Sequence, residues 1–151
     1  MSSLPFVPAL IDALEAFRFR RVEHANSELL LKRQTFNMNR AVVVVNLPAV
    51  PFDFRAYRDS LRRDVAQTCK YIPVLWGIGI QLIAVAPGIL SIDPSQHIDV
   101  VDNQWAIVQS LFLVDPDRRE YRSARTWGQV FTGKYQNAIE TVLRGHYTEA
   151  F

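Results

Sequence analysis

The sequence predicts an α+β fold, with three helices and a single mixed, largely antiparallel sheet of five to six strands. Apolar residues at helical spacing alternate along the chain with short runs that are apolar on both faces. The 151 residues, 49% of them apolar, have the length of one domain, so we expect one globular domain over 1–151. The predicted order is helix, three strands, helix, strand, an optional short strand, strand and helix. One mixed sheet with helices on its faces is the simplest packing of that order.

The first part of the chain predicts a helix followed by three strands in a meander. An amphipathic helix over about 6–17 follows from apolar residues at helical spacing: Val7, Leu10, Ile11, Leu14 and Phe17. Strands are expected over 17–24, 28–36 and 40–47, because short turns containing Asn separate them and Asn tolerates positive φ. The run from Ala41 to Val45 is apolar on both faces, which predicts a central strand.

The second part predicts the remaining elements. Asp53 caps a helix expected over about 54–69, and strands are expected over 74–86 and 105–114, with a possible short strand at 97–101. The last helix has two candidate starts. Thr126 with Gln129 fits a capping box, whereas Gly128 and Gly133 would delay the start to about Lys134, and Gly145 ends the helix in both cases.

A membrane span and a secreted location are both disfavoured by the sequence. The stretch from Tyr71 to Ile92 holds 22 residues without a charge, but Pro73 and Pro87 leave only 13 residues between them. We therefore expect a buried strand there and no membrane partner. Cys69 is the only cysteine, and the chain lacks the basic start and apolar run of a secretory signal, which predicts a cytoplasmic location.

One face of the strand expected over 74–86 is a candidate ligand site. That face carries Gly77, Gly79 and Gln81, so it is shallow and offers one polar amide. Such a face either lets a helix approach closely or forms the floor of an apolar pocket with a single orienting polar group. We predict Gly77, Gly79 and Gln81 as ligand-binding residues. No cofactor can be named from the sequence, so the cofactor is unknown.

The acidic loop 93–102 is a candidate metal site. If the segment 97–101 is extended, His97 and Asp99 share a face, and Asp102 follows closely. Two carboxylates and one imidazole would suit Mg²⁺, Mn²⁺ or Zn²⁺. The alternative is a solvated acidic loop that turns at Asp93-Pro94.

The predicted order of a helix, three strands and a helix resembles that of restriction-endonuclease-like nucleases. Those enzymes need an acid at the end of one strand and an acid-x-Lys motif on the next. Here Glu28 and Lys32 are four positions apart, so the chain departs from the pattern at the residues that would carry the chemistry. With one hairpin fewer, the same order is similar to longin-like or roadblock-like scaffolds, which act as interaction modules.

The sequence favours a non-enzymatic binding or interaction module, because it holds no complete catalytic constellation, although it does not decide whether the protein is an enzyme. We expect a homodimer or a complex with another protein, since Trp127, Phe131 and Tyr135 offer more ring surface than a short helix can bury. The alternative function is a metal-dependent hydrolase or nuclease that uses the loop 93–102.

Nucleic acid is a further, more weakly supported partner. Of the 17 basic residues 14 are Arg, which forks phosphates and stacks on rings. Arg alternates with aromatic residues in 17–21 and 118–122, a pattern that would suit base stacking and phosphate binding. The alternative for these two segments is a hairpin with alternating faces and a polar loop.

Overall fold

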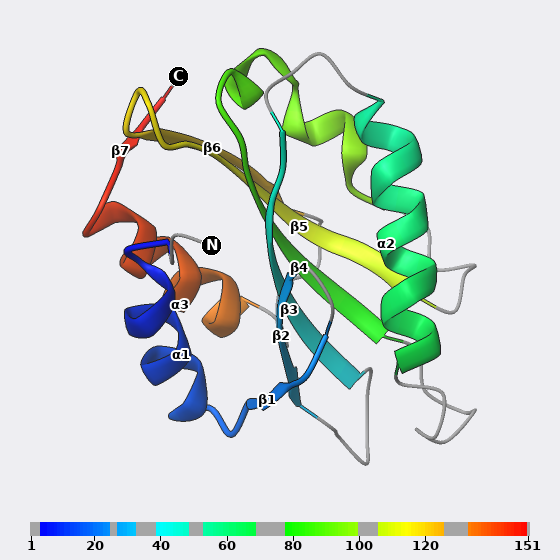
Figure 1. Ribbon diagram of the computed structural model, residues 1–151. Coiled ribbons are helices and arrows are strands. Elements are labelled where there is room, and N and C mark those ends of the chain that lie inside the picture. Colours follow the sequence, from blue (N-terminus) through cyan, green and yellow to red (C-terminus); the bar gives the residue numbers. More distant parts are fainter. Residues whose placement is uncertain are drawn as a thin grey trace.

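In the part of the chain that the structure describes, seven strands form one mixed sheet and three α-helices cover its two faces (Figure 1). The computed structural model describes residues 4–24, 27–32, 39–48, 53–68, 78–99, 106–125 and 133–150. Within these residues the strands lie side by side in the order of the sequence, from β1 to β7. The α+β class is confirmed, with seven strands where the sequence predicted five to six.

Half of the strand pairings are parallel, whereas the sequence predicted a largely antiparallel sheet. The pairs β1–β2, β2–β3 and β5–β6 are antiparallel, and β3–β4, β4–β5 and β6–β7 are parallel. Long crossovers, not hairpins, join β3 to β4 and β4 to β5, and a crossover returns the chain in the same direction. The strands are β1 (Arg20–Val22), β2 (Ser27–Lys32), β3 (Asn39–Asn46), β4 (Ile78–Val85), β5 (Ala106–Asp115), β6 (Glu120–Arg125) and β7 (Thr148–Glu149).

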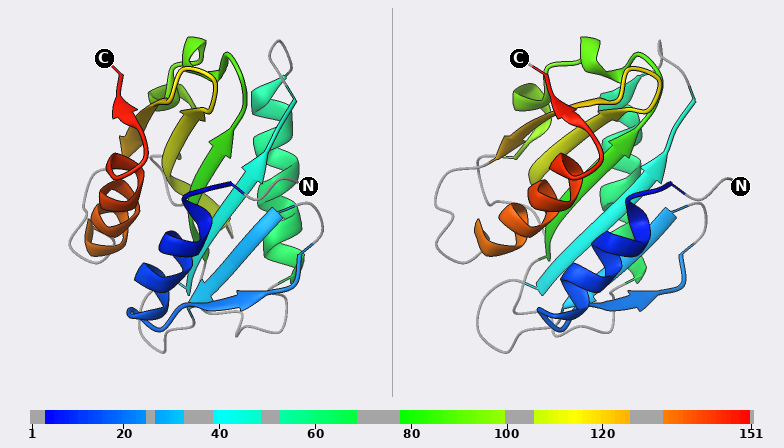
Figure 2. Two further views of the ribbon diagram at one scale, coloured as in Figure 1. Left: turned by 60° about the vertical axis from the view of Figure 1, so that its left-hand side comes forward. Right: turned by 90° about the vertical axis from the view of Figure 1, so that its left-hand side faces the viewer.

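The helices divide between the two faces of the sheet. Figure 2 shows α1 (Val7–Glu15) and α3 (Gly133–Arg144) side by side over one face, which we call the α1/α3 face. The other face carries α2 (Phe54–Thr68) and two short 3-10 helices, η1 (Ile89–Ser91) and η2 (Pro94–His97). Among the described residues, no helix combines the length and apolar composition that crossing a membrane requires.

Each face of the sheet has its own apolar core, and the central strands contribute to both. Val43 and Leu82 pack under α2, while their neighbours Val42 and Ile83 pack under α1 and α3. Strands that are buried on both faces carry apolar side chains at most positions, which explains the doubly apolar runs in the sequence.

Two segments differ from the sequence-based prediction, because local hydrogen bonds determine the conformation of each. The possible strand at 97–101 is not formed in its described part, since Asp93 caps η2 by accepting a hydrogen bond from the Ser95 amide at 3.0 Å. The sequence-based order has no strand between the one ending at residue 114 and the last helix. Instead the Asp115 carboxylate accepts hydrogen bonds from the amides of Asp117 and Arg118, at 3.0 and 3.1 Å, and the chain turns back into β6.

Candidate functional site

One end of the α1/α3 face is polar, although the rest of that face is apolar. Strand register produces most of this arrangement, because residues paired across neighbouring strands project to the same side. A bulge adds to it: β5 contains one extra residue, Gln109, opposite the step from Ile80 to Gln81. The two rows are Lys32, Arg40 and Gly79 across β2, β3 and β4, and Gln81, Ser110 and Arg125 across β4, β5 and β6.

Hydrogen bonds join five buried polar side chains into one network, which we call the Arg40 cluster: Arg40, Gln81, Gln109, Ser110 and Gln136. Arg40 Nη1 and Gln81 Nε2 both donate to Gln109 Oε1, at 3.1 and 3.0 Å. The hydroxyl of Ser110 donates to Gln81 Oε1, and Gln136 Nε2 donates to the same oxygen at 3.2 Å. Four elements therefore hold the cluster together.

The first turn of α3 lies against this cluster and adds Lys134 and Tyr135 to its surroundings. Lys32, on β2, contacts the same tyrosine. Lys32 Nζ donates to the phenol oxygen of Tyr135 at 2.8 Å and lies 4.9 Å from the centre of its ring. Lys134 Nζ lies 5.1 Å from the same ring centre. The edges of Phe17 and Phe19 pack on Tyr135 with ring centres 5.5 and 5.2 Å away, which holds the phenol in place.

Arg40 carries a buried charge that lacks a carboxylate partner in the part of the chain that the structure describes. Its exposed fraction is 2%, and its Nε has no hydrogen-bond acceptor among those residues. By contrast, Arg58, which is also buried, is paired with Asp59 and Asp99. Burial lowers the pKa of Arg40, and the nearby Tyr135 opposes part of this effect by raising that pKa. A guanidinium nevertheless keeps its proton at neutral pH.

The positive charges near Tyr135 shift the pKa of its phenol. Burial by itself would raise its pKa. The hydrogen bond and charge of Lys32, together with Lys134, outweigh burial and hold the pKa of Tyr135 below its ordinary value. The site therefore favours negative charge.

The residues predicted to bind a ligand fall partly in this cluster. Gly79 and Gln81 lie on the same face of β4, as expected, whereas Gly77 lies outside the described residues. A Cβ at Gly79 would lie 2.3 Å from Gln109 Oε1 and 3.0 Å from Arg40 Nη1. The glycine thus leaves the room that these two side chains occupy. Ligand binding by the three residues stays a prediction.

Arg40, Gln109 and Gln136 were not among the site residues predicted from the sequence. For Arg40 and Gln109, the sequence does contain a pattern that indicates a buried polar site. Arg40 opens the apolar run of β3, and Gln109 with Ser110 interrupts the apolar run of β5. A polar residue inside a doubly buried strand needs partners on one of the two faces, so it indicates a polar cluster.

The residues predicted to bind a metal are partly engaged elsewhere. The Asp99 carboxylate lies 3.2 Å from Arg58 Nη1 and 3.6 Å from Arg62 Nη1, and it accepts a hydrogen bond from the Val108 amide at 2.8 Å. The ring of His97 packs edge-on against Phe54. Asp102 lies outside the described residues, among which no three His, Cys, Asp or Glu side chains are grouped for a metal. The metal site stays a prediction.

Thermal melting with Mn²⁺ tests that metal site directly. If Asp99 exchanges its arginine partners for the ion, Mn²⁺ at 100 times its Kd adds about 2.7 kcal/mol of stability. The Asp99→Asn variant, which weakens both the ion pairs and any metal ligation, should show no gain. An unchanged melting temperature of the unaltered protein over millimolar Mn²⁺ would exclude the site.

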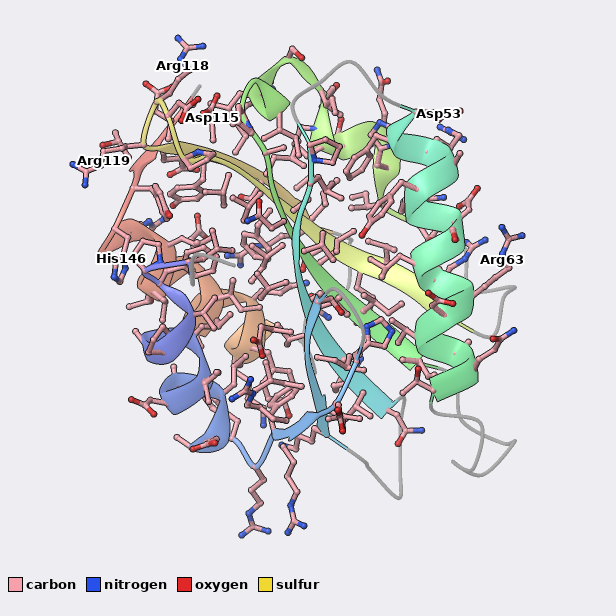
Figure 3. The ribbon with its side chains drawn as sticks, in the orientation of Figure 1. Asp53, Arg63, Asp115, Arg118, Arg119 and His146 are labelled. Carbon is pink, nitrogen blue, oxygen red and sulfur yellow. The ribbon has the colours of Figure 1, made fainter. Side chains whose placement is uncertain are left out.

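In the two segments in which Arg alternates with aromatic residues, Phe19 and Tyr121 are buried and Phe17 is half-buried. Phe19 packs on Tyr135, and the buried Tyr121 donates its hydroxyl to Glu140. Figure 3 shows Arg118 and Arg119 extending from the turn between β5 and β6 into solvent. Exposed arginines without exposed rings suit phosphate contacts better than base stacking.

No family model matches the sequence, and neither the curated proteins nor the solved structures contain a match.

Proposed function

We propose that the protein is a binding module that holds a small anionic ligand at the Arg40 cluster. The observation that supports the proposal is the buried Arg40 guanidinium, for which the described residues supply no carboxylate. An isolated buried ion costs several kcal/mol of stability, so buried charges in proteins are paired. An anion brought by a ligand would provide the missing partner.

The surroundings of Arg40 suit binding better than catalysis. The cluster consists of amides, a hydroxyl and a guanidinium, and it contains no carboxylate or imidazole that could act as a general base. The first turn of α3 lies beside the cluster and contains no acidic residue. The positive end of its helix dipole therefore adds to the attraction for an anion.

Thermal melting in a buffer without multivalent anions tests the proposal. Sodium phosphate and sodium acetate are titrated separately, with sodium chloride as the control for ionic strength. We expect at least one of them to raise the melting temperature, with a gain of about 2.7 kcal/mol at 100 times its Kd. The gain should disappear in Arg40→Met and persist in Arg63→Met, which removes an exposed arginine from α2. If every anion acts only as chloride does, the proposed function is wrong.

Self-association is proposed as a second property. Its sequence basis is reduced, because Tyr135 is buried within the chain itself, while Trp127 and Phe131 lie outside the described residues. Sedimentation at micromolar concentration should show a dimer, and a strict monomer would remove this proposal.

A further inference from the structure

We infer that the group bound at the Arg40 cluster is a phosphate dianion, either free phosphate or the end of a phosphate monoester. This inference rests on the proposed function and names the chemistry of its ligand. Three positively charged side chains support it: Arg40, which is buried, Lys32, which is half-buried, and Lys134, which is exposed.

The first step is the pairing of two like charges across neighbouring strands. Lys32 on β2 stands directly opposite Arg40 on β3, on the same face of the sheet. Like charges at directly opposite positions of an antiparallel pair destabilise the sheet. Among the residues that the structure describes, neither Lys32 nor Arg40 forms an ion pair with a carboxylate, and Lys32 instead donates a hydrogen bond to the Tyr135 phenol. A shared anion between the two would remove the repulsion.

The second step is the charge of the ligand. Lys134 brings a third cation to the same phenol ring that Lys32 contacts, and α3 has no acid in its first turn. A monocarboxylate would leave most of this charge uncompensated. A phosphate monoester carries a charge of about −1.5 to −2 and three strong acceptor oxygens. It therefore matches both the charge and the number of donors better than a carboxylate does.

The third step concerns the extent of the positive surface. Arg125 is paired with Glu140, and Arg21 is paired with Glu28. Figure 3 places Arg118 and Arg119 at the turn after Asp115, which is the other end of β5 from Gln109. A compact group of cations fits one phosphate group, whereas a nucleic acid backbone needs a row of them.

Isothermal titration calorimetry at pH 8 tests the inference with four probes. Inorganic phosphate and ribose 5-phosphate are dianions at this pH, and acetate and dimethyl phosphate are monoanions. We expect at least one dianion to bind more than tenfold tighter than both monoanions. The exposed Lys134 is changed in Lys134→Gln, which should weaken dianion binding about two- to fivefold. Arg118→Gln, the control at the far turn, should leave the affinity unchanged.

Each outcome separates the inference from the proposed function. Tight binding of inorganic phosphate alone supports the inference and identifies the free ion as the ligand. Equal or tighter binding of ribose 5-phosphate supports it and identifies a phosphorylated small molecule. If monoanions bind as tightly as dianions in an Arg40-dependent way, the inference is wrong and the proposed function stands. If no probe binds, both are wrong.

Discussion

Replacing Arg40 with methionine should strongly weaken anion binding and leave the unliganded protein at least as stable as the original. Methionine fills a similar volume, and replacing buried ions with apolar residues of similar size is often neutral or stabilising by about 1–4 kcal/mol. The loss of the hydrogen bond to Gln109 opposes this by about 1 kcal/mol. Removal of the buried charge should weaken anion binding by about 2–5 kcal/mol, or at least thirtyfold.

The second buried arginine provides a matched control with the opposite expectation. Arg58→Met leaves the mostly buried Asp99 carboxylate without its closest cation, so we expect a loss of about 3 kcal/mol. Urea unfolding of both variants, in a buffer without phosphate or other multivalent anions, measures the two free energies. A loss at Arg40→Met as large as that at Arg58→Met would show that Arg40 has a structural partner, and it would contradict the proposed site.

Substitution of Gly79 on β4 by alanine should disrupt the Arg40 cluster. The new Cβ would fall 2.3 Å from Gln109 Oε1 and 2.7 Å from Gln109 Cδ, so the amide of Gln109 must move. Overpacking of a buried site costs about 1–3 kcal/mol. The displaced amide also releases Arg40 and Gln81, so we expect anion affinity to fall together with stability.

A double-mutant cycle shows whether this contact is the cause. In the Gln109→Ala background the obstructing amide is absent, so Gly79→Ala should cost much less than in the original protein. We expect a coupling of about 0.5–3 kcal/mol between the two positions from urea unfolding. Additive effects would mean that Gly79→Ala acts through neighbours other than Gln109, and that the fit between Gly79 and Gln109 does not shape the cluster.

The sequence was sufficient for features that depend on local periodicity. Helical spacing predicts the apolar stripe of α1, and glycine placement supplied one of the two candidate starts of the last helix, near Lys134, where α3 begins at Gly133. The sharing of one face by Gly79 and Gln81 follows from the two-residue period of a strand. These predictions held because each depends on residues within a few positions of one another.

The direction of the strands and the composition of the site were decided only by the tertiary structure. Arg40 meets Gln109 across 69 positions, and Gln136 meets Gln81 across 55. The bulge at Gln109 that aligns them is specified by strand pairing, which leaves no local periodic signal. In the same way, Asp99 looks like a metal ligand beside His97, yet it is paired with Arg58, which is 41 positions away. Local spacing determines which side chains are buried, whereas the packing of distant elements determines which partners a buried polar group finds.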